Sequence, residues 1–504
     1  MHTLSFFVYL CAVFACATLT VADIQKRSFL VERVPNPKFT GRNGPRAMVK
    51  AHRKFLMPLP EGLVAAMEAQ DKKLAAAQAK RGSNSFQYFD RSEADRRGLI
   101  GELLGDLGLG GGKQNGKQDG NQNGNNANQN SNNGNQNANG NGNGNGNKGN
   151  KNGNGSTPPP VKANNTAPAP GTGARNQTGT VAAKPEKNDA EYISPVKIGG
   201  QTVNLDFDTG SSDLWVFNTQ LAASVTNGHR VYDPAKSKTF KMMAGSQFTI
   251  SYGDGSGAKG NVGTDVVDVG GAAFPAQPVE LATAVSQEFI KDQNNDGLMG
   301  LAFSKINTVK PQKQQTFFDN IKPSLAQPVF TADLRKGAAG AYTFGTIDQS
   351  KFQGALAWVP VNNTNGFWQF SSEKFAVNGG KPQAGTSGGQ AIADTGTSLM
   401  LADAKIVTAY YAQVQGAKND QQVGGFTFPC NTKLPDLAVD VGGVYMAKVT
   451  GDNINFAQVG NGMCFGGVQA TPQGQLGIYG DIFFKSQFVA FNGGNNSLGM
   501  APHK

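Results

Sequence analysis

Residues 203–217 read VNLDFDTGSSDLWVF and place a carboxylate at the tip of a strand-like run. Val203, Leu205 and Phe207 alternate with polar residues, which is the period of a half-buried strand, and the run ends in a turn of Thr, Gly and Ser. Alone, Asp208 predicts little, because an Asp before a Gly is far more often a turn residue than a catalyst. A second copy of the motif changes this interpretation.

The second copy is AIADTGTSLML, residues 391–401, which repeats the Asp-Thr-Gly at Asp394. Each copy is followed by an apolar pair and a glycine. Gly300 lies 92 positions after Asp208, and Gly480 lies 86 positions after Asp394. Two similar halves with one motif each predict a pair of lobes related by a pseudo-two-fold axis. Such an axis can set both carboxylates in one site.

Two carboxylates a few ångströms apart cannot both ionise easily, so the pair would hold one proton over a broad acidic range. The protonated member can donate to a substrate carbonyl while the ionised member takes a proton from water. The pair of carboxyls would then supply both the general acid and the general base. The reaction would need no metal and no covalent enzyme intermediate.

Charge divides the chain into two parts. Residues 180–504 hold 24 Lys and Arg against 25 Asp and Glu, whereas residues 1–179 hold 22 against 11. The basic excess therefore belongs to the N-terminal segment, which argues against a nucleic-acid-binding main domain. From about residue 180, short alternating strands separated by Gly, Asn and Asp turns predict an all-β unit.

Residues 111–156 are mostly Gly, Asn, Gln and Lys. With almost no apolar side chains, this tract cannot offset the entropy of ordering, so we expect a disordered spacer. Self-association of an Asn-rich tract is the alternative interpretation.

The first 22 residues are typical of a secretory signal peptide, with an apolar stretch from Leu4 to Leu19 and small residues before Asp23. A short membrane anchor is the alternative, but the stretch is shorter than the about 18 purely apolar residues that a span requires. The sequence therefore predicts export, with no stable membrane anchor.

The cysteines agree with export. Two of the four lie in the expected signal peptide, which leaves Cys430 and Cys464. They would form one disulfide in an oxidising compartment, or else a buried thiol pair. With four His in total and no metal-ligand spacing, we expect no metal and no cofactor.

From about residue 180 to its C-terminus the chain resembles the pepsin-like aspartic endopeptidases, and among them the secreted fungal aspergillopepsin and penicillopepsin type. The matching pieces, in family order and at family spacing, are DFDTGSSDLWVF, YGDGSG, DGLMGLAF, GFWQF, IADTGTSLML and IYGDIFFKSQFVAFNGGNNSLGMAP. The resemblance implies an all-β bilobal fold with pseudo-two-fold lobes and an active site in the cleft between them.

The resemblance also implies roles for the matching residues. Asp208 and Asp394 would be the catalytic pair, with a water held between them as the nucleophile. Thr209 and Thr395 would cross-link the two loops by hydrogen bonds.

Four further loop residues would support the carboxylates. Gly210 and Gly396 would bring backbone N–H groups to them, and the hydroxyls of Ser211 and Thr397 would bond their outer oxygens. Ordinary turn capping is the alternative role of these hydroxyls. Some relatives with less acidic optima have Ala in place of Thr397, so this residue favours an acid enzyme.

SYGDGSG, residues 251–257, resembles the family's flap, a hairpin that closes over an extended peptide. Trp215 matches the tryptophan whose indole N–H can bond the flap tyrosine hydroxyl. Fungal relatives with Asp at the position of Asp254 can accept Lys before the scissile bond. The expected flap residues are Tyr252, Gly253, Asp254 and Ser256.

Other matches concern the C-terminal lobe and the precursor. Cys430 and Cys464 match the family's C-lobe disulfide. HRKF resembles the end of the family's inhibitory segment and makes Lys54 the candidate blocker of the two aspartates. A solvated basic helix is the alternative. The processing point is open, because Lys80-Arg81 is a dibasic site whereas a start near Gly179 fits the family better.

These observations predict five segments. They are a signal peptide at 1–22, a basic prosegment at 23–104, an Asn- and Gly-rich linker at 105–178, an N-terminal protease lobe with flap at 179–352 and a C-terminal lobe at 353–504.

The function that the resemblance implies is a secreted acid endopeptidase, made as a zymogen and acting as a monomer on extended polypeptides. It would prefer hydrophobic residues around the cut, can accept Lys before it, and would be inhibited by pepstatin-type compounds. Asn362 and Asn495 begin N-glycosylation sequons. A vacuolar destination is an alternative to secretion. A catalytically inactive binding homologue and a surface adhesive protein are the other hypotheses.

Overall fold

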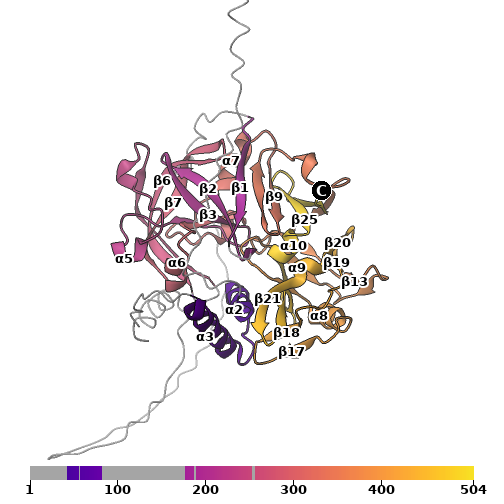
Figure 1. Cartoon of the computed structure of the whole chain (residues 1–504). Helices are drawn as coiled ribbons and strands as arrows, with labels where there is room; N and C mark the ends of the chain where they lie inside the picture. Colours follow the sequence, from indigo (N-terminus) through magenta and orange to yellow (C-terminus); the bar gives the residue numbers. More distant parts are fainter. Residues whose placement is uncertain (1–42, 56, 82–175, 187–188, 253–255) are drawn as a thin grey trace, which may run out of the picture. The chain divides into compact units, whose positions relative to one another are not determined.

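The computed structural model describes residues 43–55, 57–81, 176–186, 189–252 and 256–504 (Figure 1). The described elements belong to one compact unit, Thr40–Lys504. The expected signal peptide, nearly all of the linker, and Gly253 and Asp254 of the flap lie outside the described residues.

Strands dominate the described secondary structure, which confirms the all-β prediction. The strands of the N-terminal half are β1 (Gly179–Pro185), β2 (Tyr192–Ile198), β3 (Gln201–Asp208), β4 (Leu214–Val216), β5 (Lys241–Ser251), β6 (Gly257–Val269), β7 (Ala272–Val285), β8 (Gly297–Gly300), β9 (Val329–Arg335) and β10 (Ala338–Phe344). Those of the C-terminal half are β11 (Ala357–Pro360), β12 (Gln369–Ser371), β13 (Lys374–Val377), β14 (Gln383–Ala384), β15 (Gln390–Ala393), β16 (Met400–Ala402), β17 (Lys418–Asp420), β18 (Gly425–Pro429), β19 (Leu437–Val441), β20 (Tyr445–Val449), β21 (Asn455–Gly460), β22 (Met463–Gly466), β23 (Val468–Ala470), β24 (Gly477–Tyr479), β25 (Gln487–Asn492) and β26 (Ser497–Pro502).

Helices are few and mostly short. The α-helices are α2 (Gly44–Lys54), α3 (Leu63–Arg81), α5 (Ala223–Thr226), α6 (Gln287–Lys291), α7 (Phe317–Ile321), α8 (Ala404–Tyr411), α9 (Gly451–Ile454) and α10 (Asp481–Phe484). Single 3₁₀ turns are η2 (Pro234–Lys236), η3 (Ser304–Ile306), η4 (Lys322–Ser324) and η5 (Gln349–Lys351).

The strand pairing repeats itself around the two Asp-Thr-Gly motifs. In the first copy β3 runs parallel to β8, β8 antiparallel to β4, and β4 parallel to β7. In the second copy β15 runs parallel to β24, β24 antiparallel to β16, and β16 parallel to β23. The same pattern of directions in both halves confirms the predicted pseudo-two-fold relation.

The two glycines that follow the motifs serve as matched anchors. Asp208 is opposite Gly300 in the β3–β8 register, and Ala393, just before Asp394, is opposite Tyr479, just before Gly480. A Cβ on Gly300 would lie 2.5 Å from a backbone nitrogen, and one on Gly480 would lie 2.0 Å from a backbone oxygen. Only glycine allows the neighbouring loop this close.

One sheet joins the two halves. It has 13 strands in the order β11-β26-β25-β9-β10-β1-β2-β3-β8-β4-β7-β6-β5, so strands from the C-terminal half extend the sheet of the N-terminal half. Three smaller sheets complete the C-terminal half: β12-β15-β24-β16-β23, β14-β13-β19-β20 and β17-β18-β22-β21.

Helices α2 and α3 form a hairpin N-terminal to the sheets. The Asn43 side chain caps α2 by accepting a bond from the Arg46 amide at 2.9 Å, and α2 ends at Lys54, before Pro58 and Pro60. An ion pair between Arg46 and Asp71 joins the helices.

The hairpin packs on the C-terminal half. Val49, Ala51 and Leu63 are fully buried, Gly44 lies against the Phe465 ring, and Leu63 lies against Gly424. Burial of this apolar surface holds the hairpin to the C-terminal half.

Cys430 and Cys464 form a disulfide between the end of β18 and β22, with Cα atoms 4.9 Å apart. The disulfide interpretation is therefore confirmed over the thiol pair. Within the described part of the chain, no helix is long and apolar enough to span a membrane, and no group of three or more His, Cys, Asp or Glu could hold a metal ion.

Candidate active site

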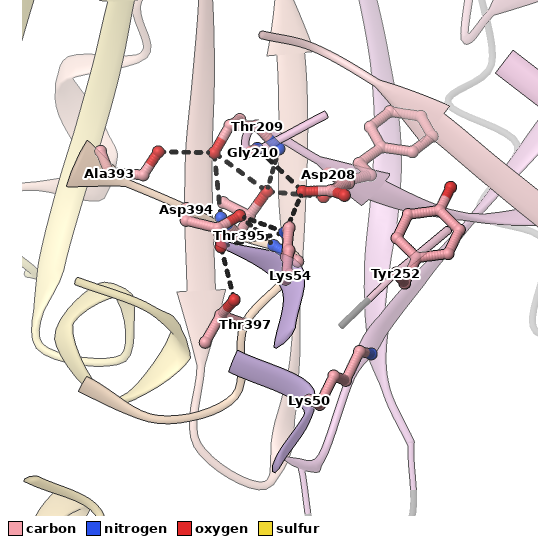
Figure 2. A network of polar contacts seen from close by, with 12 residues as sticks. Lys50, Lys54, Asp208, Thr209, Gly210, Tyr252, Ala393, Asp394, Thr395 and Thr397 are labelled. Carbon is pink, nitrogen blue, oxygen red and sulfur yellow. Dashed lines mark hydrogen bonds and ion pairs between the residues drawn. The ribbon is translucent and has the colours of Figure 1, made fainter. Parts of the chain in front are cut away.

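The two repeated motifs meet in one buried site (Figure 2). Asp208 ends β3 and Asp394 follows β15, and their exposed fractions are 1% and 0%. The amide of Gly210 donates to Asp208 Oδ1 at 2.8 Å, and the amide of Gly396 donates to Asp394 Oδ1 at 3.1 Å. Each carboxylate is thus held by its own loop.

Each glycine also lies against the opposite aspartate. A Cβ on Gly210 would be 2.4 Å from Asp394 Oδ1, and one on Gly396 would be 2.3 Å from Asp208 Oδ1. Any side chain here would push the carboxylates apart, so the Gly of each Asp-Thr-Gly is a condition for bringing the pair together.

The two threonines tie the loops to each other. The Thr209 amide donates to Thr395 Oγ1 at 3.1 Å, and the Thr395 amide donates to Thr209 Oγ1 at 2.9 Å. Their hydroxyls donate onward, Thr209 to the Ala393 carbonyl at 2.8 Å and Thr395 to the Phe207 carbonyl at 2.5 Å. All of these groups are buried, so the network holds the two halves of the site in one geometry.

The two remaining loop hydroxyls differ. Thr397 Oγ1 donates to Asp394 Oδ2 at 2.5 Å, as the resemblance implies. Ser211 Oγ is buried and makes no hydrogen bond of normal geometry with any described residue, although it lies near enough to help lower the pKa of Asp208. The loops are therefore symmetric in their glycines and threonines but not in these outer hydroxyls.

Lys54, the last residue of α2, enters the site between the aspartates (Figure 2). Its Nζ lies 2.8 Å from Asp208 Oδ1, 2.9 Å from Asp394 Oδ1 and 3.0 Å from Asp394 Oδ2. The side chain is 5% exposed. One ammonium contacting both carboxylates shows that they share a single site. Its neighbour Phe55 packs edge-on against Phe367, with ring centroids 5.6 Å apart.

The charges in the site perturb one another. Burial raises the pKa of Asp208, but the Lys54 ammonium and several hydrogen bonds outweigh it and lower this pKa to about 2. Burial raises the pKa of Asp394; Lys54 lowers it, but the charge on Asp208 raises it further, and the net pKa lies above the usual value. Burial lowers the pKa of Lys54, and the two carboxylates more than compensate. Asp394 is therefore the carboxyl that protonates first on acidification.

An aromatic cluster holds the base of the hairpin that the resemblance implies to be the flap. The Trp215 indole N–H donates to the Tyr252 hydroxyl at 2.8 Å, and the Tyr252 amide donates to the Ser256 carbonyl at 2.7 Å. Phe289 of α6 packs edge-on against both Trp215 and Tyr252, at centroid distances of 4.8 and 5.6 Å. Because α6 is a short helix inside a strand-rich region, no sequence pattern singled out Phe289.

A second buried carboxyl pair, Asp213 and Glu280, was not revealed by the sequence; Glu280 is opposite Trp215 in the β4–β7 register. Asp213 Oδ1 accepts from the Thr308 amide at 3.0 Å and its hydroxyl at 2.6 Å. The Asn307 amide group bonds both Asp213 Oδ1 and Glu280 Oε1, at 3.3 and 3.2 Å. The other oxygen of each carboxyl has no hydrogen-bond partner among the described residues. A proton shared between these two oxygens would satisfy both.

The central geometry supports one kind of chemistry. Two carboxyls that interact strongly, with one pKa lowered and the other raised, can divide the roles of base and acid. The base takes a proton from a water while the acid donates to the carbonyl oxygen under attack. The oxygens that now hold Lys54 Nζ are those that would hold this water.

Comparisons with known proteins agree with this chemistry. The family model for eukaryotic aspartyl proteases matches residues 191–503. Aspergillopepsin-1 of Aspergillus flavus is 50% identical over 325 residues, which cover 64% of this chain and 79% of that protein. Penicillopepsin-1 of Penicillium janthinellum is 50% identical over 326 residues, covering 64% and 99%. An aspartic protease of Coccidioides posadasii is 49% identical over 338 residues, covering 65% and 76%.

Proposed function

The chain belongs to the eukaryotic aspartyl protease family and is an aspartic endopeptidase of the fungal pepsin-like type, and we propose that it is a secreted acid protease held inactive by its own prosegment. The observation that carries the proposal is the Lys54 ammonium within 3.0 Å of three oxygens of the two aspartates.

In the proposed reaction Asp208 and Asp394 share one proton and bind the attacking water. One carboxylate of the pair acts as the base that removes a proton from the water, and the other carboxyl, which holds the shared proton, donates it to the carbonyl oxygen of the scissile peptide bond. The tetrahedral intermediate then breaks its C–N bond as the carboxyl that took the water's proton gives it to the leaving amine, while the other carboxylate takes a proton back from a hydroxyl of the intermediate, which restores the one-proton pair. The threonine network and the glycine amides keep both carboxylates in place throughout.

Inhibition in the precursor follows from the same charges. Lys54 occupies the position of the water and favours the ionised form of Asp208. Lys54 lowers the pKa of Asp208. The ion pair between them therefore has its full strength at pH values above the usual pKa of a carboxyl, and it weakens as pH falls toward 2. Protonation of Asp394 begins this weakening at higher pH. Acid would therefore release the prosegment and start catalysis in one step.

The substrate would be an unfolded or extended polypeptide covered by the flap hairpin, with hydrophobic residues on both sides of the cut. The aromatic cluster of Trp215, Tyr252 and Phe289 supports an apolar preference. Acceptance of Lys through Asp254 remains a proposal from the resemblance, because this residue lies outside the described part of the chain.

Export, a monomeric enzyme and a mature start near Gly179 complete the proposal. The start is supported by β1, which begins at Gly179 and pairs with both β10 and β2 inside the main sheet. Removal of β1 would break this sheet, so cleavage N-terminal to it is the arrangement that preserves the enzyme.

The test is acidification of the purified precursor. At about pH 3 it should cleave denatured haemoglobin, pepstatin should stop the cleavage, and at pH 7 it should be inactive. Asp208→Asn serves as the matched inactive control, since it keeps the shape of the side chain but not the base. Sequencing of the new N-terminus locates the processing site. Absence of pepstatin-sensitive proteolysis at both pH values would refute the proposal.

A further inference from the structure

His229 is a histidine whose two ring nitrogens both face backbone carbonyl oxygens. Its Nδ1 lies 3.0 Å from the Asn295 carbonyl and its Nε2 lies 3.3 Å from the Ile290 carbonyl. The side chain is 0% exposed. A carbonyl oxygen can only accept a hydrogen bond, so both contacts are satisfied only when both ring nitrogens carry a proton. The geometry therefore fits the charged imidazolium, the form that acid pH favours.

Ile290 belongs to α6, which is a single helical turn. Within it the Ile290 amide donates to the Ser286 carbonyl at 3.3 Å, and the Ser286 side chain makes no N-cap bond. A helix this short is marginal without outside partners. The Ser286 amide fixes the start of the turn by donating to the Gly257 carbonyl at 3.0 Å. His229 is the corresponding partner at the end of the turn.

Phe289 connects α6 to the hairpin expected to be the flap. Its ring packs edge-on against Trp215 and Tyr252, at centroid distances of 4.8 and 5.6 Å. Burial raises the pKa of Tyr252, and the charge on the catalytic Asp208 raises it further, so Tyr252 lies within electrostatic reach of the reacting groups. A displacement of α6 would therefore move a side chain that packs directly on Tyr252.

His229 also packs on the same aromatic cluster from another side. Its ring stacks on Phe217 with centroids 3.9 Å apart and planes 10° apart, and Phe217 packs against Trp215 at 6.0 Å. Near His229, the Gln293 side chain donates to the Asn227 carbonyl at 3.1 Å and ties the two loops together. The stacking fixes the plane of the imidazole and so keeps both nitrogens aimed at their carbonyls.

The charge of His229 changes within the acid range. Burial lowers its pKa, the two carbonyls that accept its protons raise it, and the net pKa lies below the ordinary value. As pH rises through this pKa, one of the two N–H groups is lost. The contact with Asn295 is the shorter one, so the bond to Ile290 of α6 is the one that we expect to break.

Other charged groups lie around this histidine. They are Asp296 before β8, Arg230 next in the chain, Lys291 and Asp292 at and after the end of α6, and Glu191, whose carboxylate accepts from the Asn295 side chain. Asp296 Oδ1 lies 3.9 Å from Nδ1 of His229. Burial raises the pKa of Asp296 to about 7 and that of Asp292 well above the usual value. Both carboxyls therefore stay largely protonated at the acid pH values where His229 changes its charge.

We propose that His229, protonated on both ring nitrogens, is a positioning residue that holds the end of α6 and thereby keeps Phe289 and Tyr252 in place for substrate binding. The inference rests on the proposed protease function and adds to it a residue outside the two Asp-Thr-Gly motifs. Because His229 acts through α6 and not on the reacting atoms, its loss should raise KM more than it lowers kcat.

The kinetic test measures kcat and KM of the acid-activated enzyme between pH 3 and 6, on a peptide with Phe on both sides of the cut. His229→Leu removes both donors, and its KM at pH 3 should rise by about three- to tenfold, the effect of one lost hydrogen bond. His229→Gln keeps N–H donors that do not titrate, so its KM at pH 3 should stay within about twofold of the wild type. The ratio of KM, wild type over His229→Gln, should then rise by about three- to tenfold as pH increases to 6.

His503→Gln is the matched control. It removes a histidine that contacts the Phe484 carbonyl at 2.9 Å, outside α6 and its contacts. Its KM should show the same pH dependence as that of the wild type. An equal rise of KM in this variant and in His229→Leu would mean that loss of any buried histidine loosens the enzyme.

Nitrogen-15 NMR of the wild type observes the imidazole directly. The chain has four histidines, and cleavage at either candidate processing point removes His2 and His52. The mature enzyme keeps His229 and His503, and His503→Gln assigns the two signals. At pH 3 both ring nitrogens of His229 should carry protons, and one proton should be lost below the ordinary histidine pKa of about 6.5.

A neutral His229 at pH 3, an unchanged KM in His229→Leu, or the same pH dependence of KM in the wild type and His229→Gln would overturn the inference. If His229→Leu does not fold, His229→Gln and the NMR titration decide the question. Failure of the activated wild type to cleave the peptide at any pH would instead refute the protease proposal, whereas cleavage with a KM that does not respond to His229 would refute only this inference.

Discussion

Thr209 and Thr395, 186 positions apart in the chain, each accept the other's backbone N–H through their hydroxyl oxygens, at distances of 3.1 and 2.9 Å. Each hydroxyl also donates to a carbonyl of the opposite motif, so each half of the site is held by the other. The geometry of the aspartate pair therefore depends on hydrogen bonds between the two halves. Neither motif alone can produce this geometry.

Thr395→Val tests this cross-link. The substitution removes the acceptor of the Thr209 amide and the donor to the Phe207 carbonyl, both of which are buried. We expect the free energy of unfolding to fall by about 1–3 kcal/mol and kcat to fall with it. Thermal unfolding of the mature enzyme at pH 4 measures the loss of stability. Thr395→Ser keeps the hydroxyl and should lose much less stability and kcat. Equal losses in the two variants would contradict the role of the hydroxyl.

Gly480→Ala tests the anchor behind Asp394. The new Cβ would lie 2.0 Å from the Thr397 carbonyl oxygen and 2.3 Å from that of Leu399, and backbone atoms cannot move aside cheaply. We expect a loss of more than about 3 kcal/mol of stability, seen as lost expression or a strongly lowered Tm. Gly380→Ala is the control, because its Cβ would meet a single carbonyl oxygen at 3.0 Å. If both variants are equally stable, close approach is not the reason for glycine at 480.

Glu280→Gln tests the buried Asp213–Glu280 pair. Burial raises the pKa of both carboxyls, and the Asp213 charge raises that of Glu280 further. A carboxyl with a raised folded-state pKa contributes stability at low pH that is lost as pH rises through that pKa. The amide of Gln replaces the shared proton with a permanent N–H donor. We therefore expect the variant to unfold at a higher Tm than the wild type at pH 7, by an amount corresponding to about 1–3 kcal/mol.

The comparison of pH values decides the Glu280 prediction. At pH 4 the wild type retains the proton, so the Tm difference should shrink or reverse. Asp348→Asn, at an exposed position, should show no such dependence on pH. A Tm difference that is the same at pH 4 and pH 7 would mean that the pair does not share a proton.

The duplicated motif made the centre of the fold predictable. The alternation of the strands, the turn residues and the spacing to Gly300 and Gly480 are enough to predict two similar halves, because each of these signals is local and occurs twice. The β3–β8 and β15–β24 pairings show the same parallel arrangement in the two halves, as the predicted two-fold relation requires. What local signals could not predict is the single sheet of 13 strands, since pairing of β25 with β9 joins segments more than about 150 residues apart.

The site was predictable to the extent that its residues lie in the two motifs. Lys54 is different, because a lysine at the end of a basic helix has many possible environments, and the resemblance, more than its own sequence signal, singled it out. Phe289, Asp213 and Glu280 act through contacts between distant segments and have no motif.

The decisive measurement is the pH at which the uncleaved precursor opens its active site. Binding of a fluorescent pepstatin analogue between pH 3 and 7 reports this directly. Lys54→Met removes the ammonium that contacts both aspartates, so its midpoint should shift upward by about one pH unit or more relative to the wild type. Arg53→Met removes a neighbouring charge of the same helix and should leave the midpoint unchanged. Equal midpoints for the wild type and Lys54→Met would contradict the proposal that Lys54 holds the precursor inactive.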